Sequence, residues 1–140
     1  MPMTYHFKVH GGRIPWAECV ELEGCVTQGR NRAELGRNMV QALNLYLSEP
    51  ETSTVIFPGP SRGRPAKGTV GVEVDPAVAF AMMLRQARVQ SRLTQKQAAR
   101  RLGMRNLFSY QRLERRANPS LLTLKKVKGL FPELSLDELV

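Results

Sequence analysis

Cysteine and long apolar runs are both scarce in this chain of 140 residues. Cys19 and Cys25 are the only cysteines, which excludes a framework of several disulfides. They also lack the closely spaced pairs of a zinc site. A site that adds His6 and His10 is conceivable, but lone cysteines on strands are more often small buried hydrophobes. We therefore expect no metal and no cofactor.

No apolar stretch approaches the roughly 20 residues that a membrane span needs. No segment pairs a basic face with a broad face of Trp, Phe and Leu. The first residues, MPMTYHFKVHGG, show no apolar core behind a charged start. We expect no membrane association, no signal peptide, and a cytoplasmic protein with reduced thiols.

Acidic residues are scarce in one part of a chain whose net charge is +9. Residues 85–128 contain thirteen Lys and Arg and a single acid, Glu114, whereas residues 1–57 contain five basic and six acidic residues. A basic block confined to one half indicates a polyanion such as nucleic acid as partner. Two domains sharing this length would each be marginally stable, so we also expect a homo-oligomer, either a dimer or a tetramer.

Residues 1–57 alternate apolar and polar positions in a way that predicts strands over 4–10, 16–22 and 23–29. Helical spacing follows, with Asn31 as the N-cap and Pro50 as the stop. The stretch TVIFP, residues 54–58, indicates one more strand. The order β-β-β-α-β predicts an α+β head.

Residues 58–70 are rich in Pro, Gly and charge, and we interpret them as a linker. The stretch TVGVEV, residues 69–74, predicts a short strand that either completes the sheet of the head or pairs with its copy in a second chain. The hazard of an unpaired edge favours pairing between chains.

Residues 75–140 carry helix signals only, which predicts an all-α domain of about five helices. The expected starts are Pro76 after Asp75, the capping box of Thr94 and Gln97, Asn106, Ser120 and Ser135. Leu121, Leu124 and Val127 are expected to face inward.

Two short helices, 94–102 and 106–115, are joined by a turn at Gly103, which is the helix-turn-helix arrangement. Ala98 and Ala99 are small enough for the helices to approach closely. Basic residues around the rim would neutralise phosphates and release their counterions. The alternative is a solvated basic bundle without a ligand, but the charge bias and the caps favour DNA binding.

The stretches LTQKQAARRLG and RLERRANPSLLTL resemble the phage-repressor-like (Cro-type) helix-turn-helix regulators. The stretches FKVH, WAECVELEGCVTQG and ALNLYL resemble HicB antitoxins. This resemblance implies a partial ribonuclease-H-like head joined to a DNA-binding domain. It also implies that the head binds and silences a HicA-type ribonuclease toxin, and that the protein represses its own operon.

The resemblance also places the DNA contacts when the pattern is aligned on Glu114. The helix cap then falls on Asn106, and Arg112 becomes the best candidate for bidentate contact with guanine. Leu107 and Phe108 stand where relatives are polar, and either contact a thymine methyl group or are partly buried. The full predicted set is Gln95, Lys96, Arg105, Asn106, Leu107, Phe108, Ser109, Gln111, Arg112, Arg115 and Arg116.

The head is not expected to be an enzyme, because its carboxylates do not converge as two-metal catalysis requires. Strand alternation places Glu18 and Glu21 on opposite faces. We expect instead a toxin-binding surface of Trp16, Glu18, Glu21 and Glu23. The alternative is a free-standing transcription regulator whose head senses a small ligand in an aromatic pocket.

Overall fold

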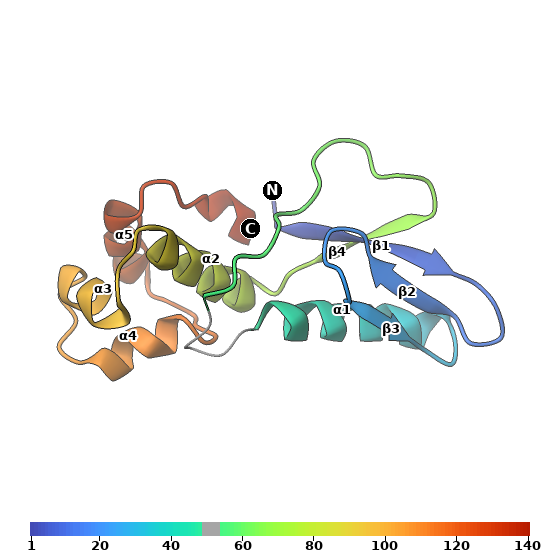
Figure 1. Cartoon of the computed structure of the whole chain (residues 1–140), viewed down its shortest axis with the longest axis horizontal. Coiled ribbons are helices and arrows are strands. Elements are labelled where there is room, and N and C mark those ends of the chain that lie inside the picture. The colour runs from blue at the N-terminus through green and yellow to red at the C-terminus, as the bar shows by residue number, and fades with distance from the viewer. Residues whose placement is uncertain (49–53) are drawn as a thin grey trace. The chain divides into compact units, whose positions relative to one another are not determined.

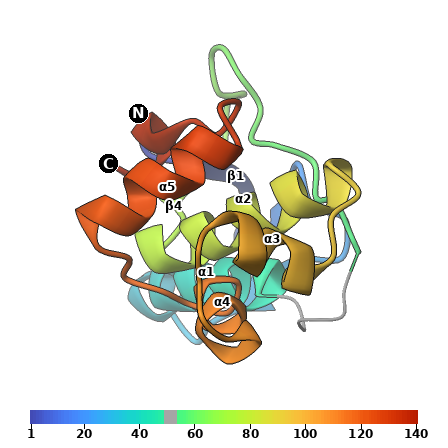
Figure 2. The same cartoon turned by 90° about the vertical axis from the view of Figure 1, so that its left-hand side faces the viewer.

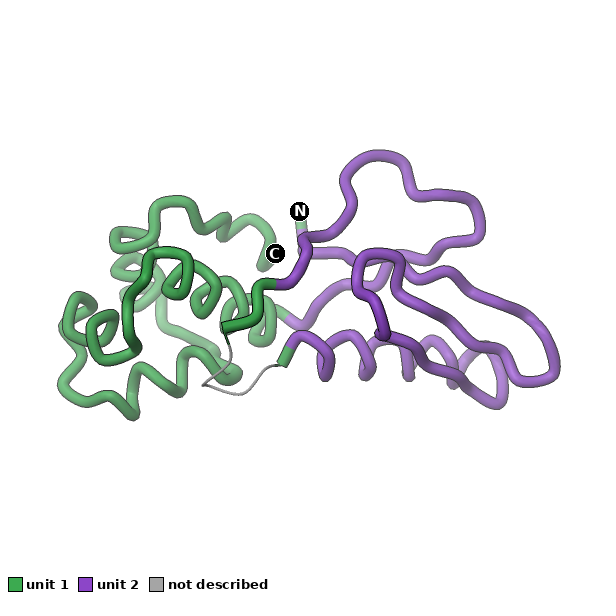
Figure 3. Tube along the Cα trace, in the orientation of Figure 1, with its two compact units in different colours: residues 1, 48–56, 76–140 green, residues 2–47, 57–75 purple. Residues whose placement is uncertain are grey.

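The computed structural model of the chain describes residues 1–48 and 54–140, and they form two compact units. The sheet unit comprises residues 2–47 and 57–75, and the helical unit comprises residue 1, residues 48–56 and residues 76–140 (Figure 3). The helix stop expected at Pro50 lies outside the described residues. Within the described part of the chain, no helix has the length and apolar character needed to cross a membrane.

The sheet unit is a mixed α+β structure with one antiparallel sheet and one helix (Figure 1). Its strands are β1 (Thr4–His10), β2 (Trp16–Cys19), β3 (Val26–Gln28) and β4 (Thr69–Glu73), in the order β3-β2-β1-β4. Helix α1 (Arg32–Leu47) lies along one face of this sheet.

The period of two along each strand decides which side chains meet α1. Tyr5 and Phe7 of β1 are buried, as are Ala17 and Cys19 of β2. The helix contributes residues at three- and four-residue spacing, namely Leu35, Met39, Leu43 and Leu47. Alternation and helical periodicity therefore predict these elements, although β2 ends at Cys19 rather than at residue 22 and β3 begins at Val26 rather than at residue 23.

The fourth strand of the sheet differs from the expectation. Residues 54–58 form no strand, and β4 pairs with β1 of the same chain, with Val72 opposite Tyr5. The predicted strand at 54–58 and the favoured pairing of 69–74 between chains are therefore both wrong. Strand β2 occupies one edge of β1, and residues 69–73 pair with the other edge from Thr4 to Lys8.

The segment expected as a linker, 58–70, belongs to the sheet unit. The hydroxyl of Tyr5 donates to the carbonyl of Pro58 over 2.8 Å, and the N–H of Ser61 donates to Glu21 over 2.8 Å. A Pro- and Gly-rich composition limits apolar burial, but it leaves the backbone able to pack through hydrogen bonds.

All elements of the helical unit are helices. They are α2 (Pro76–Gln90), α3 (Gln95–Arg101), α4 (Leu107–Leu113), α5 (Leu121–Leu130) and a final 3₁₀ turn, η1 (Leu136–Leu139). The capping box of Thr94 and Gln97 is present, and Asn106 and Ser120 cap α4 and α5 through their side chains. Ser135 precedes η1 without a side-chain cap.

The core of the helical unit draws on α2, α3, α4, α5 and the segment that follows α5. It contains Phe80, Leu84, Ala87, Ala98, Ala99, Leu102, Tyr110, Leu113, Val127, Phe131 and Leu134. The inward face expected of α5 is correct for Val127 and wrong for Leu121, which is exposed at the first position of the helix. Figure 2 shows α3 and α4 nearest the viewer.

Gly29 generates a stability test of the sheet unit, because a Cβ atom there would lie 2.5 Å from the backbone nitrogen of Leu35 in α1. We expect Gly29→Ala to destabilise the unit by about 1–3 kcal/mol, since the backbone of α1 has to move. The matched control is Gly36→Ala within α1, where a Cβ meets nothing within 4 Å and helix propensity improves by up to about 1 kcal/mol.

Trp16 is the only tryptophan and lies in β2, so its fluorescence during urea unfolding reports on this unit. Equal midpoints for the two variants would contradict the close approach of Gly29 to α1.

Candidate nucleic-acid interface

Helices α3 and α4 pack against each other through small and aromatic side chains. Ala98 and Ala99 of α3 are buried, and Tyr110 and Leu113 form the buried face of α4. Gly103 follows the C-cap of α3 and has a φ of +71°, a conformation that glycine adopts without strain. The two helices therefore pack as a pair joined by a short connection.

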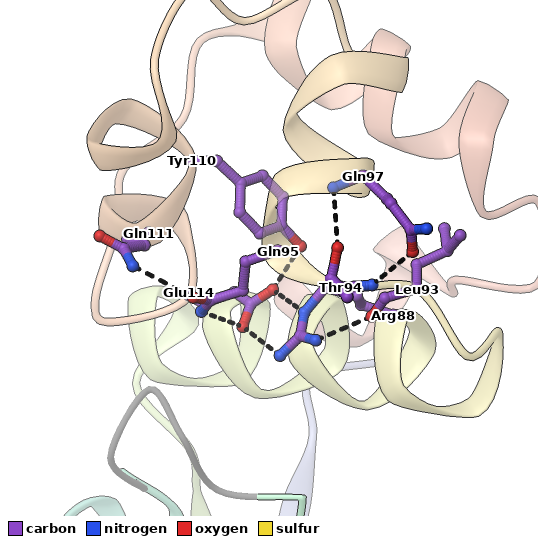
Figure 4. Close-up of polar contacts among 8 residues, drawn as sticks. All are labelled: Arg88, Leu93, Thr94, Gln95, Gln97, Tyr110, Gln111 and Glu114. Carbon is purple, nitrogen blue, oxygen red and sulfur yellow. Dashed lines mark hydrogen bonds and ion pairs between the residues drawn. The ribbon is translucent and has the colours of Figure 1, made fainter.

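The carboxylate of Glu114, at the end of α4, ties three helices together (Figure 4). Arg88 of α2 donates to it from Nε over 2.6 Å and from Nη2 over 3.1 Å. Gln95 of α3 donates over 3.2 Å, and the hydroxyl of Tyr110 in α4 donates as well. Arg88 also donates to the carbonyl of Leu93, which precedes α3. The position of α4 is therefore set by hydrogen bonds from both preceding helices.

This ion pair is removed from water. The side chain of Glu114 has no exposed surface, and that of Arg88 is 9% exposed. Burial alone would lower the pKa of Arg88, but the hydrogen bonds and charge of Glu114 outweigh it and raise the pKa above its usual value. Burial and the adjacent carboxylate raise the pKa of Tyr110, so the phenol keeps the proton it donates.

The predicted DNA-binding residues divide into an exposed group and a partly buried pair. The exposed residues are Lys96, Arg105, Asn106, Leu107, Phe108, Ser109, Arg112, Arg115 and Arg116. Gln95 and Gln111 are half-buried. The structure also exposes Arg100 and Arg101 of α3, which the predicted set omits although both are part of the basic block.

The side chain of Gln95 is engaged within the protein. Its amide nitrogen donates to Glu114, and its carbonyl oxygen accepts from Gln111 over 3.2 Å. The carbonyl oxygen of Asn106 likewise accepts the backbone N–H of Ser109 over 2.8 Å. Gln95 and Asn106 therefore help to hold α3 and α4, which the resemblance alone did not reveal.

Leu107 and Phe108, for which the sequence left partial burial open, are both exposed. The exposed fractions are 40% for Leu107 and 58% for Phe108. The guanidinium of Arg112 lies over the Phe108 ring, 5.9 Å from its centroid. The i,i+4 spacing of these two residues was a signal for this contact, but sequence reasoning did not use it.

The residues predicted to bind a toxin do not form one acidic surface. Trp16 is 37% exposed and stacks on His10, with ring centroids 4.0 Å apart. His10 Nε2 lies 3.2 Å from a carboxylate oxygen of Glu18. These three side chains form a cluster on the face of the sheet opposite to α1, and Glu23 is exposed on the loop after β2.

Glu21 has a structural position instead. Its side chain is only 4% exposed, and it accepts the backbone N–H of His6, contacts His6 Nδ1 over 2.8 Å, and accepts the N–H of Ser61. Burial alone would raise the pKa of Glu21, but these hydrogen bonds outweigh it and hold the pKa below its usual value. The interpretation of Glu21 as exposed surface is therefore wrong.

The sheet unit contains several side chains of the types that bind metals. Cys19 and Cys25 are both buried with free thiols, and their mutual hydrogen bond together with burial raises the pKa of Cys19. Among the residues that the structure describes, no three His, Cys, Asp or Glu side chains converge on a point where a metal ion could bind. A cavity of about 470 Å³ beside β2 is lined by Lys8, Glu18, Cys25 and their neighbours rather than by aromatic rings.

A comparison with models of known protein families finds no match for this chain, and a comparison with curated proteins finds none either. Function is therefore inferred from the geometry of α3 and α4, from the exposed cluster around Trp16, and from the motifs in the sequence.

The buried pair of Arg88 and Glu114 generates a second stability test. We expect Arg88→Met to cost about 3–5 kcal/mol, because it leaves the buried carboxylate of Glu114 without its cation. The double variant Arg88→Met/Glu114→Leu should cost clearly less than the two single variants added together, since the uncompensated charge is gone. Circular dichroism during urea unfolding measures both quantities.

The matched control is Arg101→Met, which makes the same change at an exposed position of α3 and should alter stability by no more than about 0.5 kcal/mol. If the double variant lost as much stability as the two single variants added together, Arg88 and Glu114 would not be energetically coupled.

Proposed function

We propose that the chain binds duplex DNA in a sequence-dependent manner, with α4 in the major groove and α3 above it. One observation carries this proposal: the buried network on Glu114 holds α3 and α4 together while the basic residues around them stay exposed. Between Gln95 and Arg116 there are seven basic residues, all exposed, and the single acid is the buried Glu114. A solvated bundle without a ligand has no need of such a bias.

The residues take different parts in this proposal. Arg112 lies on the exposed face of α4, where a guanidinium can reach the N7 and O6 atoms of guanine. Lys96, Arg105, Arg115 and Arg116 contact phosphates on either side. Two copies of the chain would present two recognition helices about 34 Å apart, which matches one turn of DNA and favours a homodimer or a tetramer.

We further propose that the sheet unit binds a basic ribonuclease of the HicA type and does not itself cleave RNA, so that the protein is an antitoxin that represses its own operon in the cytoplasm. The HicB-like stretches of the sequence support this role and imply the partial ribonuclease-H-like fold. The exposed cluster of Trp16 and Glu18, with Glu23 close by in sequence, offers an aromatic anchor and negative charge to such a partner.

The competing function is a transcription regulator with a ligand-sensing head. Its support from the structure is weaker, because the aromatic residues that would line a ligand pocket are used elsewhere. Tyr5 and Phe7 are fully buried in the core of the sheet unit, and Tyr46 packs on Phe57 with centroids 5.5 Å apart. The cavity beside β2 offers carboxylates and thiols in their place.

Arg112 and Lys96 should affect DNA binding in different ways. We expect Arg112→Ala to cost about 1–3 kcal/mol and to relax the preference for one base pair in each half-site. Lys96→Ala should weaken binding to all sequences alike and lower the slope of log affinity against log salt by about one per half-site. Fluorescence anisotropy with a selected duplex and a random duplex, at several salt concentrations, measures both effects.

Arg37→Ala is the control, because Arg37 is an exposed arginine on α1 of the sheet unit. If Arg112→Ala and Lys96→Ala weakened selected and random DNA equally, α4 would not be the element that reads the sequence.

Glu18 and Glu23 should be required for neutralising the toxin. We expect Glu18→Lys/Glu23→Lys to abolish protection in a growth assay with a co-expressed HicA-type ribonuclease, because the reversed charges repel a basic partner. Operator binding by the isolated variant should be unchanged. Glu133→Lys, an exposed reversal in the helical unit, is the control and should still protect.

Glu21 is left intact in this experiment because its carboxylate holds the fold. Cells that remain protected by the double reversal would show that the partner docks on another surface.

A further inference from the structure

The exposed face of α4 carries an apolar and a cationic side chain close to each other. Phe108 and Arg112 are one helical turn apart, and the guanidinium lies over the ring. The buried face of the same helix consists of Tyr110 and Leu113, so Phe108 has no part in the core. Together with Leu107 it places apolar surface at the start of a helix whose surroundings are strongly basic.

This combination of groups limits what can cover the face. A second copy of the chain would bring seven further exposed basic residues against the first seven, which Coulomb repulsion disfavours. The major groove of DNA offers negative phosphates on both sides and one strongly apolar group on its floor, the C5-methyl of thymine. Phenylalanine is among the side chains that contact this methyl group.

We propose that Phe108, assisted by Leu107, reads the methyl group of a thymine close to the guanine that Arg112 binds. The inference rests on the proposed DNA-binding function and deepens it by naming the bases. Successive base pairs are about 3.4 Å apart along a strand, so a separation of 5.9 Å between the guanidinium and the ring places the two bases within two base pairs of each other.

The contact between the two side chains has a consequence for specificity. A guanidinium resting on an aromatic ring has fewer conformations to lose when it binds guanine in a bidentate manner. Phe108 therefore acts in two ways: its ring contacts the methyl group and it positions Arg112. Removing the methyl from the DNA tests the first role without altering the protein.

The experiment begins with duplexes selected from a randomised pool by the full chain. In the best duplex, each thymine is replaced singly by deoxyuridine, which lacks only the C5-methyl group. We expect one thymine in each half-site to be sensitive, at a position within two base pairs of the guanine whose preference Arg112→Ala relaxes. Its replacement should weaken binding about fourfold, which corresponds to about 0.8 kcal/mol for one buried carbon.

With Phe108→Ala the same replacement should no longer change the affinity, whereas Phe108→Leu should retain part of the sensitivity. Leu45→Ala, at an exposed leucine on α1 of the sheet unit, is the control and should keep the full fourfold effect. Because Phe108 is exposed, its replacement does not disturb the core.

The outcomes separate the two proposals. A selected sequence whose affinity is unchanged by every deoxyuridine replacement would overturn the thymine contact and leave sequence-dependent DNA binding in place. If Phe108→Ala kept the full sensitivity to deoxyuridine, the role of Phe108 would be overturned, and sequence-dependent DNA binding would again remain in place. If the selection yields no preferred sequence, sequence-dependent DNA binding itself is overturned, and the thymine contact with it.

Discussion

The helical unit depends on one buried carboxylate. Glu114 accepts hydrogen bonds from α2, α3 and α4, and Arg88 supplies the opposite charge that makes its burial tolerable. It is also the only acid between residues 85 and 128. Because Glu114 is paired with Arg88 inside the protein, residues 85–128 supply no other acid to the exposed basic residues of α3 and α4. The same interaction therefore sets the position of α4 and leaves its surroundings basic.

The two faces of α4 separate stability from recognition. Tyr110 and Leu113 anchor the helix in the core, and Phe108 and Arg112 face outward, with the guanidinium of Arg112 over the Phe108 ring. Gln95 and Gln111, whose amides could read adenine, are half-buried instead, and Gln95 hydrogen-bonds to both Glu114 and Gln111. What remains outward is suited to guanine and to a thymine methyl group, and this difference is the physical basis of the proposed base preference.

The sheet unit divides its carboxylates in a similar way. Glu21 joins β1 to the segment around Ser61 and is nearly buried, whereas Glu18 lies with Trp16 and His10 on the open face of the sheet. A buried carboxylate with several donors stabilises the unit, and an exposed one beside an aromatic ring is available to a basic partner. The acidic residues among residues 1–57 therefore have two different roles, one structural and one at the surface.

The sequence by itself determined the helices and most of the strands, because caps, periodicity and alternation are local signals that Thr94, Asn106 and the residues of β1 carry without help from distant parts of the chain. It also determined the basic block and the positions of α3 and α4 within it. Only the tertiary structure decided that residues 69–73 rather than 54–58 fill the edge beside β1, and which carboxylates are buried. Those outcomes depend on which of several segments, far apart in the chain, pairs with a given strand edge or accepts from given donors. A local sequence pattern contains no information about that choice.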